Sequence, residues 1–257
     1  MKVLIHPDYI HLKENIECIP SGNYMTDRVF CDNRNKVELV TLKGESYVIK
    51  KFKKPNWFNR FVYTYFRKSK ARRAYEHAGT LLNVGIETPK PVAYIEIRKY
   101  GLFDTGYFIS EYIAFPLLNE VVNLSPEQQQ AVKKDFLFFT AHLHQRKIIH
   151  KDYNAGNIMF YKGADDNYRF VLIDINRLAV GKNSLHLCMQ AFNQLGVQLD
   201  QMFTIISQYA DIRKCDVVNS LIVLLMNYKH RSRRQRYKRT WKYLKYRFRK
   251  YLRHGSV

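Results

Sequence analysis

The stretch from residue 150 to 159, HKDYNAGNIM, most constrains what this chain can fold into. It follows an apolar pair, Ile148 and Ile149, and its small residues are turn formers. Asp152 and Asn157 stand five residues apart within it, and both carry oxygen atoms able to bind a cation. An ordinary surface loop needs only turn formers. A carboxylate and an amide held between apolar stretches therefore indicate a loop with a chemical function.

A second carboxylate is expected beside this loop. The segments 157–161 and 168–175 look like strands around a turn at 163–166, which predicts a β-hairpin. A hairpin returns the chain to where it began, so Asp174 should lie beside Asn157. Because Mg²⁺ prefers carboxylate and amide oxygens, Asn157 and Asp174 are the candidate metal ligands. Asp152, at the mouth of the loop, is the candidate base for an incoming hydroxyl.

Lys50 and Glu76, which lie upstream of the loop, are the candidate residues for binding a nucleotide. The segments 29–30, 37–42 and 47–52 predict a three-stranded antiparallel meander, with Lys50 on its last strand. Apolar residues at helical spacing between 69 and 85 predict a helix that carries Glu76. Lys50 is expected to bind nucleotide phosphates, and Glu76 to hold it through an ion pair. Each residue alone is ordinarily a solvated side chain, but the five in this order rarely arise by chance.

The remaining pattern predicts an α+β protein with two lobes. Ser125, Pro126 and Glu127 form a strong helix start, and apolar residues then repeat at helical spacing to about residue 145. Residues 184–228 look helical. We therefore expect an N-lobe over 1–112, a C-lobe over 113–228, and a basic amphipathic segment over 229–257.

The ordered set Lys50, Glu76, Asp152, Asn157 and Asp174 resembles that of the protein-kinase-like fold. More narrowly, RKSKARRAYEHAGTLLNVGIETPKP (67–91), the HKDYNAGNI loop and LIDINR (172–177) resemble the lipopolysaccharide kinases. The resemblance implies an antiparallel-sheet N-lobe and a mainly helical C-lobe. It also implies ATP as phosphate donor, Mg²⁺ as cofactor and a lipopolysaccharide precursor as acceptor. The acceptor hydroxyl would belong to 3-deoxy-manno-octulosonic acid (Kdo) or to heptose, and both remain open.

Two departures from the kinase pattern leave alternatives open. No GxGxxG stretch is present, and FCDNRNK (30–36) fills that turn, so Arg34 or Lys36 is the candidate substitute for binding phosphate. No Ala-Pro-Glu follows the DIN tripeptide at 174–176, which argues against a peptide-docking protein kinase. An atypical protein or RNA-associated kinase, and a pseudokinase that acts as a membrane adaptor, are the alternatives.

The charge of the chain indicates a polyanionic partner. It has 43 Lys and Arg against 22 Asp and Glu, a net charge of +21. Residues 229–253 carry 13 of these cations, no acid, and an aromatic stripe at helical spacing, which favours a helix on an anionic membrane surface. Packing of that helix on the C-lobe and RNA binding are the alternatives, although no specific nucleic-acid signature is present. With no secretory signal and no long apolar run, we expect a cytoplasmic protein, peripheral on the inner face of the inner membrane.

Overall fold

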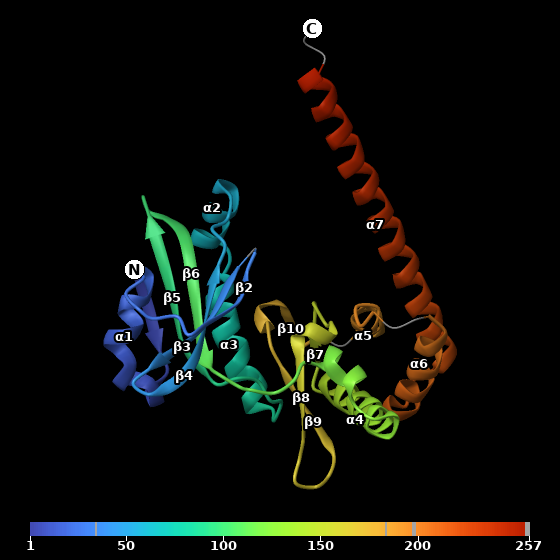
Figure 1. Ribbon diagram of the computed structural model, residues 1–257. Coiled ribbons are helices and arrows are strands. Elements are labelled where there is room, and N and C mark those ends of the chain that lie inside the picture. The colour runs from blue at the N-terminus through green and yellow to red at the C-terminus, as the bar shows by residue number, and fades with distance from the viewer. Residues whose placement is uncertain (34, 183, 197–198, 255–257) are drawn as a thin grey trace.

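The computed structural model describes residues 1–33, 35–182, 184–196 and 199–254, which form two lobes (Figure 1). The N-lobe is built on a six-stranded antiparallel sheet in the order β1-β5-β6-β4-β3-β2. Its strands are β1 (Lys2–Ile5), β2 (Arg28–Asp32), β3 (Lys36–Leu42), β4 (Glu45–Phe52), β5 (Pro91–Lys99) and β6 (Leu102–Glu111). The expected meander is confirmed as β2, β3 and β4.

One face of this sheet is covered by the N-terminal segment. A 3-10 turn (Pro7–Leu12), α1 (Lys13–Cys18) and a second 3-10 turn (Ile19–Ser21) lie across it. Leu12, Ile16 and Ile19 are fully buried there because their spacing of four and three places them on one face of the helical stretch. This covering layer makes the sheet a rigid support for residues on its opposite face.

The opposite face is covered by α3 (Lys70–Asn83), which lies between the sheet and the C-lobe (Figure 1). The helix begins where Ser69 caps it by accepting a hydrogen bond from the backbone N–H of Arg72 at 3.1 Å. Its buried stripe consists of small residues and one leucine: Ala71, Ala74, Ala78 and Leu81. A Cβ on Gly106 of β6 would meet Ala71 Cβ at 3.1 Å, so glycine permits this close approach.

The C-lobe is mainly helical. Its helices are α4 (Pro126–Gln145), α5 (Leu185–Phe192), α6 (Leu199–Arg213) and α7 (Val217–His254). Two short ladders accompany them: β7 (Ile148–His150) with β10 (Leu178–Val180), and the hairpin of β8 (Ile158–Lys162) and β9 (Tyr168–Leu172). Short 3-10 turns lie at Leu118–Asn123, Ala155–Asn157 and Ile175–Arg177. The expected hairpin and the helix over 126–145 are confirmed.

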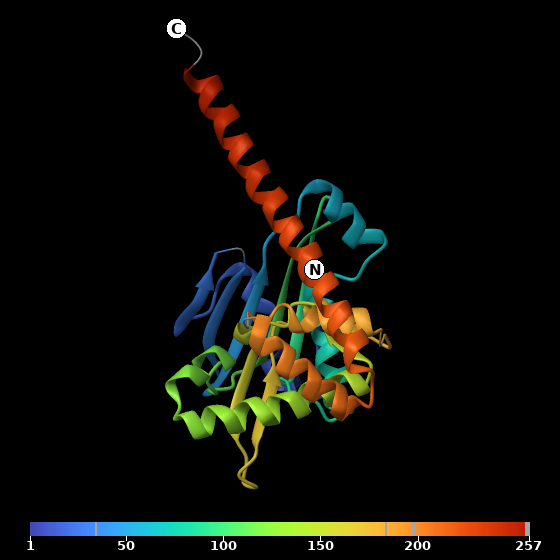
Figure 2. The same ribbon diagram turned by 90° about the vertical axis from the view of Figure 1, so that its right-hand side faces the viewer.

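Two helices lie at the periphery of the packed body. α2 (Trp57–Tyr65) follows β4 within the basic stretch, and none of its residues is buried. α7 runs without interruption from Val217 to His254, so its first turns pack in the C-lobe while its later part projects outward (Figures 1 and 2). Of the helices in the described ranges, none combines the length and apolar character that crossing a membrane requires.

Candidate active site

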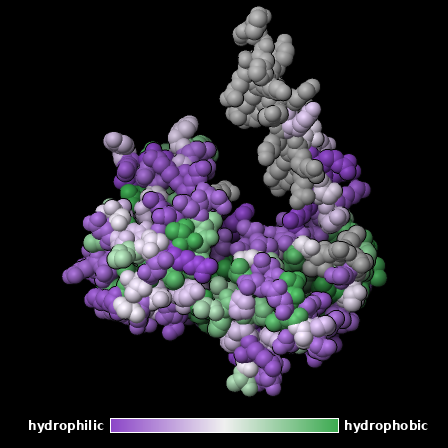
Figure 3. Space-filling model, viewed as in Figure 1, coloured by the Kyte–Doolittle hydropathy of each residue, from purple (hydrophilic) through white to green (hydrophobic). Residues whose placement is uncertain are grey.

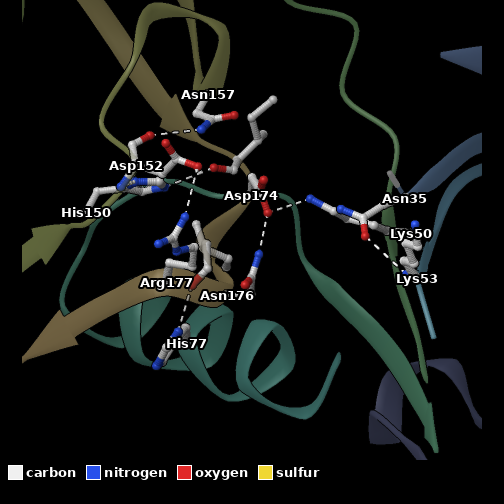
Figure 4. Close-up of polar contacts among 12 residues, drawn as sticks. Asn35, Lys50, Lys53, His77, His150, Asp152, Asn157, Asp174, Asn176 and Arg177 are labelled. Atoms are coloured by element: carbon white, nitrogen blue, oxygen red, sulfur yellow. Dashed lines mark hydrogen bonds and ion pairs between the residues drawn. The ribbon is translucent and has the colours of Figure 1, made fainter. Parts of the chain in front are cut away.

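Two ladders bring the residues of the HKDYNAGNIM loop beside Asp174 (Figure 4). The backbone N–H of Ile173 donates to the carbonyl of Asn157 at 3.0 Å, which joins the two sides of the hairpin next to Asp174. The amide Nδ2 of Asn157 donates to the carbonyl of Asp152 at 2.9 Å. The structure therefore brings together the three loop residues that the sequence predicts, Asp152, Asn157 and Asp174.

His150 fixes the position of Asp152. Its ring is fully buried, and its Nδ1 accepts a hydrogen bond from the backbone N–H of Asp152 at 3.1 Å. Nε2 therefore carries the proton and donates to the carbonyl of Ile173 at 3.2 Å. Burial lowers the pKa of His150, although the Ile173 carbonyl and the charges of Asp174 and Asp152 oppose the shift. His150 is thus a neutral, packed histidine that ties the loop to the hairpin.

Asp174 is held in an uncommon backbone conformation at the edge of the site. Its φ and ψ of 53° and 41° lie in the left-handed region, which few residues other than glycine adopt. Its Oδ1 accepts hydrogen bonds from Lys50 Nζ and from Asn176 Nδ2, each at 2.5 Å. Burial raises the pKa of this carboxyl, but Lys50, His150 and Asn176 outweigh burial and lower the pKa overall. Asp174 is therefore a carboxylate at neutral pH.

Lys50 and Glu76 do not form the expected ion pair. The carboxylate of Glu76 is bonded instead to Lys68 at 2.8 Å and to Arg72 at 2.9 Å. Arg72 stands one turn earlier on the same helix, so it reaches Glu76 at little cost in side-chain entropy. Burial raises the pKa of Glu76, and the two cations together lower it below its usual value. Lys50 instead forms an ion pair with Asp174. Both members of the expected pair therefore bind other residues.

The structure also does not bring Lys36 to this site. In the register of β3 and β4, Lys36 pairs with Lys51 whereas Val37 pairs with Lys50. Since successive side chains alternate between faces, Lys36 and Lys50 point to opposite faces of the sheet. Lys36 Nζ lies 2.6 Å from Oε1 of Glu38, a buried carboxylate. Arg34, the other expected phosphate ligand, lies outside the described residues.

A pocket of about 620 Å³ opens in front of the two aspartates. Its walls come from the start of α2, the start of α3, β6, the HKDYNAGNIM loop (the candidate catalytic loop) and the turn after β9. The last two contribute Asp152, Asp174, Asn176 and Arg177. Among the described residues, six cationic side chains line it: Lys53, Lys54, Arg67, Lys70, Arg73 and Arg177. Hydrophilic residues gather where the lobes meet below α7 (Figure 3). The pocket is thus electropositive apart from the carboxylates at its wall.

Arg73 and Arg177 define the part of this pocket nearest the catalytic loop. The Nη1 atom of Arg177 lies 3.7 Å from Oδ2 of Asp152. Arg73 is half-buried, and burial lowers its pKa with a further contribution from the neighbouring cations Arg67 and Arg177. Like charges that line one pocket favour an anion between them. Arg67 and Arg73 belong to a run of ten Lys and Arg without an acid from 50 to 73, and that run is the signal in the sequence that could have found them.

The donor set fits a magnesium ion bound together with a nucleotide. No group of three or more His, Cys, Asp and Glu able to hold a metal occurs among the described residues. Mg²⁺ bound with nucleotide needs only one or two protein carboxylates, since phosphates and waters supply its other ligands. Asn157 donates through Nδ2 to the Asp152 carbonyl, which leaves Oδ1 as its ligating atom. Asp174 is ionised and accepts both hydrogen bonds through Oδ1. Asn157 Oδ1 and Asp174 Oδ2 are therefore the atoms that would bind such an ion.

Comparison with known proteins identifies the family. Residues 23–200, more than half of the chain, match the lipopolysaccharide kinase (Kdo/WaaP) family. The chain belongs to this family. As a member of a kinase family it is a phosphotransferase, and the expected resemblance to the lipopolysaccharide kinases is confirmed. Among curated proteins, none matches the sequence.

Solved structures confirm the two-lobed kinase-like fold. The structure of WaaP in complex with acyl carrier protein is similar with a TM-score of 0.63 at 14% identity, over 91% of this chain and 99% of WaaP. A suspected aminoglycoside phosphotransferase from Ralstonia eutropha JMP134 is similar with a TM-score of 0.52 at 12% identity, over 84% of this chain and 85% of that protein. The expected α+β fold is therefore confirmed.

Proposed function

We propose that this kinase transfers the γ-phosphate of ATP to a hydroxyl of an inner-core sugar, Kdo or heptose, of a lipopolysaccharide precursor. The observation that carries the proposal is one pocket lined by Asp152, Asp174 and six cations. A base, a metal ligand and a strongly positive wall in one cavity suit an acceptor that is itself anionic. The matching family supports the reaction class and the kind of acceptor.

The proposed reaction needs positioning and charge neutralisation more than covalent chemistry by the protein. Lys50 binds the nucleotide phosphates, and Asn157 and Asp174 hold Mg²⁺, which neutralises charge on the β- and γ-phosphates when bound. Asp152 orients the acceptor hydroxyl and takes its proton as the oxygen bonds to the γ-phosphorus. The bond from that phosphorus to the β–γ bridging oxygen breaks, and ADP leaves. His150 keeps Asp152 in place throughout, through its 3.1 Å hydrogen bond.

The cations of the pocket give the acceptor side its selectivity in this proposal. Arg67, Lys70 and Arg73 come from the α2–α3 loop and the first turn of α3, and they line the same pocket as Asp152. A sugar acid, or a sugar next to a phosphate group, places its anion among them while its hydroxyl meets Asp152. A neutral acceptor gains nothing from these residues, which distinguishes the proposal from a kinase for uncharged alcohols.

A membrane-bound precursor sets the proposed location, the cytoplasmic face of the inner membrane. The net charge of +21 favours peripheral attachment to an anionic surface. WaaP was solved in complex with acyl carrier protein, so a carrier protein is a further partner to test for this chain. Binding assays with and without lipid distinguish these two partners, because only binding to a membrane surface requires lipid.

Mass spectrometry of core lipopolysaccharide from cells with and without the chain tests the proposal. We expect one phosphate on an inner-core sugar to disappear in cells that lack the chain. Unchanged core phosphate, with phosphate lost instead from serine residues, would favour an atypical protein or RNA-associated kinase. ATP binding by the purified protein without transfer to any acceptor would favour a pseudokinase adaptor.

A further inference from the structure

The outer face of α2 is an exposed aromatic surface. Trp57 and Phe66 are 76% and 77% exposed, and Phe58, Phe61 and Tyr65 are also exposed. The rings of Phe61 and Tyr65 lie 5.0 Å apart, those of Phe61 and Phe66 5.8 Å, and those of Trp57 and Phe58 6.2 Å. We call these five residues, Trp57, Phe58, Phe61, Tyr65 and Phe66, the α2 aromatic face. Large aromatic side chains gathered in this way on a surface mark an interaction site.

The inner face of α2 is fixed to the sheet by polar and aromatic contacts. Arg60 Nε donates to the carbonyl of Phe103 at 2.8 Å, and its Nη2 lies 3.4 Å from Oδ1 of Asp104. Thr64 Oγ1 accepts from the backbone N–H of Phe103 at 2.8 Å. The rings of Tyr63 and Phe103 pack edge to face at 5.5 Å. The helix is therefore held in one orientation, and its aromatic face is presented outward by the folded protein.

The charges around α2 identify the partner. From residue 50 to 73 there are ten Lys and Arg and no acidic residue. Lys53 and Arg67, which also line the pocket, are exposed before and after the helix. Trp, Tyr and Phe beside cations are typical of helices that lie in the interface of an anionic bilayer. We propose that the α2 aromatic face is a membrane-docking site that inserts into the headgroup region of an anionic bilayer. The positive charge of this stretch attracts the anionic surface over a Debye length.

Docking through α2 would bring the catalytic pocket to the lipid surface. Asn56, Asn59 and Tyr63 of this helix and its cap line the same pocket as Asp152. α2 and the outer part of α7 also project toward one side of the molecule (Figures 1 and 2). A lipid-anchored acceptor can then enter the pocket without leaving the bilayer. This link to catalysis depends on the proposed function, but the docking itself does not.

Tryptophan fluorescence tests the proposal, because the chain has only two tryptophans, Trp57 and Trp241. The full-length Trp241→Phe variant reports on Trp57 alone. With vesicles of phosphatidylglycerol and phosphatidylethanolamine whose acyl chains carry bromine, we expect a blue shift and quenching of Trp57. We also expect protection of Trp57 from acrylamide. If the protein sediments with the vesicles while Trp57 stays unshifted and open to acrylamide, another surface binds and the proposal is overturned.

Variants of exposed residues separate docking from folding. In the same Trp241→Phe background, Phe58→Ser with Phe61→Ser should weaken partitioning into these vesicles by about tenfold or more, since two large apolar side chains lose their burial in lipid. Phe138→Ser is the matched control, because Phe138 is half exposed on α4, in the C-lobe away from α2. Equal losses in the two variants, or none in either, would overturn the proposal.

The alternative partner for the α2 aromatic face is a protein. Purified acyl carrier protein without lipid is the probe, and we expect Phe58→Ser with Phe61→Ser to leave its binding unchanged. If the double variant no longer binds acyl carrier protein but still binds the vesicles, α2 is a protein-docking site and the membrane proposal is overturned. None of these binding assays contains ATP or an acceptor, so they test docking apart from the proposed reaction. The double variant should still phosphorylate a delipidated acceptor, so failure of that reaction in the wild type would count against the proposed function alone.

Discussion

Lys50 Nζ lies 2.5 Å from Asp174 Oδ1, and this contact joins the sheet of the N-lobe to the hairpin of the C-lobe. It places the cation assigned to the nucleotide phosphates against the carboxylate assigned to the metal. Asn176 bonds to the same oxygen, and His77 of α3 bonds through Nδ1 to the carbonyl of Ile175 at 2.7 Å. Both lobes therefore set the position of Asp174.

Double-mutant cycles should show which residue is coupled to Lys50. Lys50→Ala and Asp174→Ala remove one shared contact, so their losses in kcat/KM should be strongly non-additive. Lys50→Ala and Glu76→Ala should be nearly additive, because Glu76 is bonded to Lys68 and Arg72. Strong coupling of Lys50 to Glu76 and additivity with Asp174 would contradict the arrangement seen here.

Arg73→Gln should raise the KM for the acceptor and leave the KM for ATP within about twofold. The side chain lies in the pocket beside Arg67 and Arg177, and one charge-assisted hydrogen bond to an anion contributes about 1.5–3 kcal/mol, or roughly tenfold to a hundredfold in affinity. Lys133→Gln, on the exposed surface of α4, is the control for loss of one charge. A rise in the KM for ATP larger than that in the KM for the acceptor would place Arg73 at the nucleotide and contradict this role.

His144 should make stability depend on pH in mildly acidic solution. It is fully buried on α4, bonded through Nδ1 to Tyr209 Oη at 2.8 Å, and burial lowers its pKa from 6.5 to about 3. The unfolded chain therefore binds a proton that the folded protein excludes, so stability falls as pH drops below 6.5. Between pH 7 and pH 5 the loss is about 2 kcal/mol. Denaturant unfolding should show a loss about 2 kcal/mol larger in the wild type than in His144→Phe, because His150, whose pKa burial also lowers, contributes equally to both. Parallel pH profiles would refute the role of His144.

Deleting residues 229–257 should abolish most of the salt-sensitive binding to anionic vesicles. The deletion removes 13 of the 43 Lys and Arg and none of the 22 acidic residues. Each cation near an anionic bilayer contributes about 1 kcal/mol, within a Debye length. Tyr237, Trp241 and Tyr243 are exposed, so the truncated protein should fold and bind ATP. Insoluble truncated protein would instead show that this part of α7 packs on the C-lobe.

The loop and hairpin residues could be predicted because their geometry is local. Asp152 and Asn157 belong to one turn, and Asp174 follows a strand that pairs with the one after that turn. Spacing along the chain was therefore enough to bring the three together. The lobe order and the long helix over 126–145 were predictable for a similar reason, since caps and apolar periodicity act within a few residues.

Residue spacing along the chain could not predict which residues pair with Glu76, or to which face of the sheet Lys36 points. Both Lys68 and Arg72 lie closer to Glu76 along the chain than Lys50 does, and they form ion pairs with its carboxylate. The face that Lys36 occupies follows from the pairing register of β3 with β4, where a shift by one residue would reverse it. The family resemblance matched Lys50 and Glu76 by residue type, but it did not predict which residues they contact.

α2 escaped prediction because its aromatic residues are exposed rather than buried. Apolar periodicity predicts a helix through the face it buries, and the part of α2 that packs on the sheet is Arg60, Tyr63 and Thr64. The basic residues around it were visible in the sequence, but their meeting with Asp152 and Asp174 in one pocket required the fold.

The measurement that tests the account most directly compares wild type with Asp152→Asn on a purified inner-core acceptor and Mg-ATP. Mass spectrometry of the product should show one added phosphate on a sugar hydroxyl with the wild type. The variant should be slower by about a hundredfold or more, since it has no base for the hydroxyl proton. Calorimetry should show unchanged Mg-ATP affinity in Asp152→Asn and weakened affinity in Asp174→Ala. No phosphate on the sugar with the wild type, or full activity in Asp152→Asn, would contradict the account.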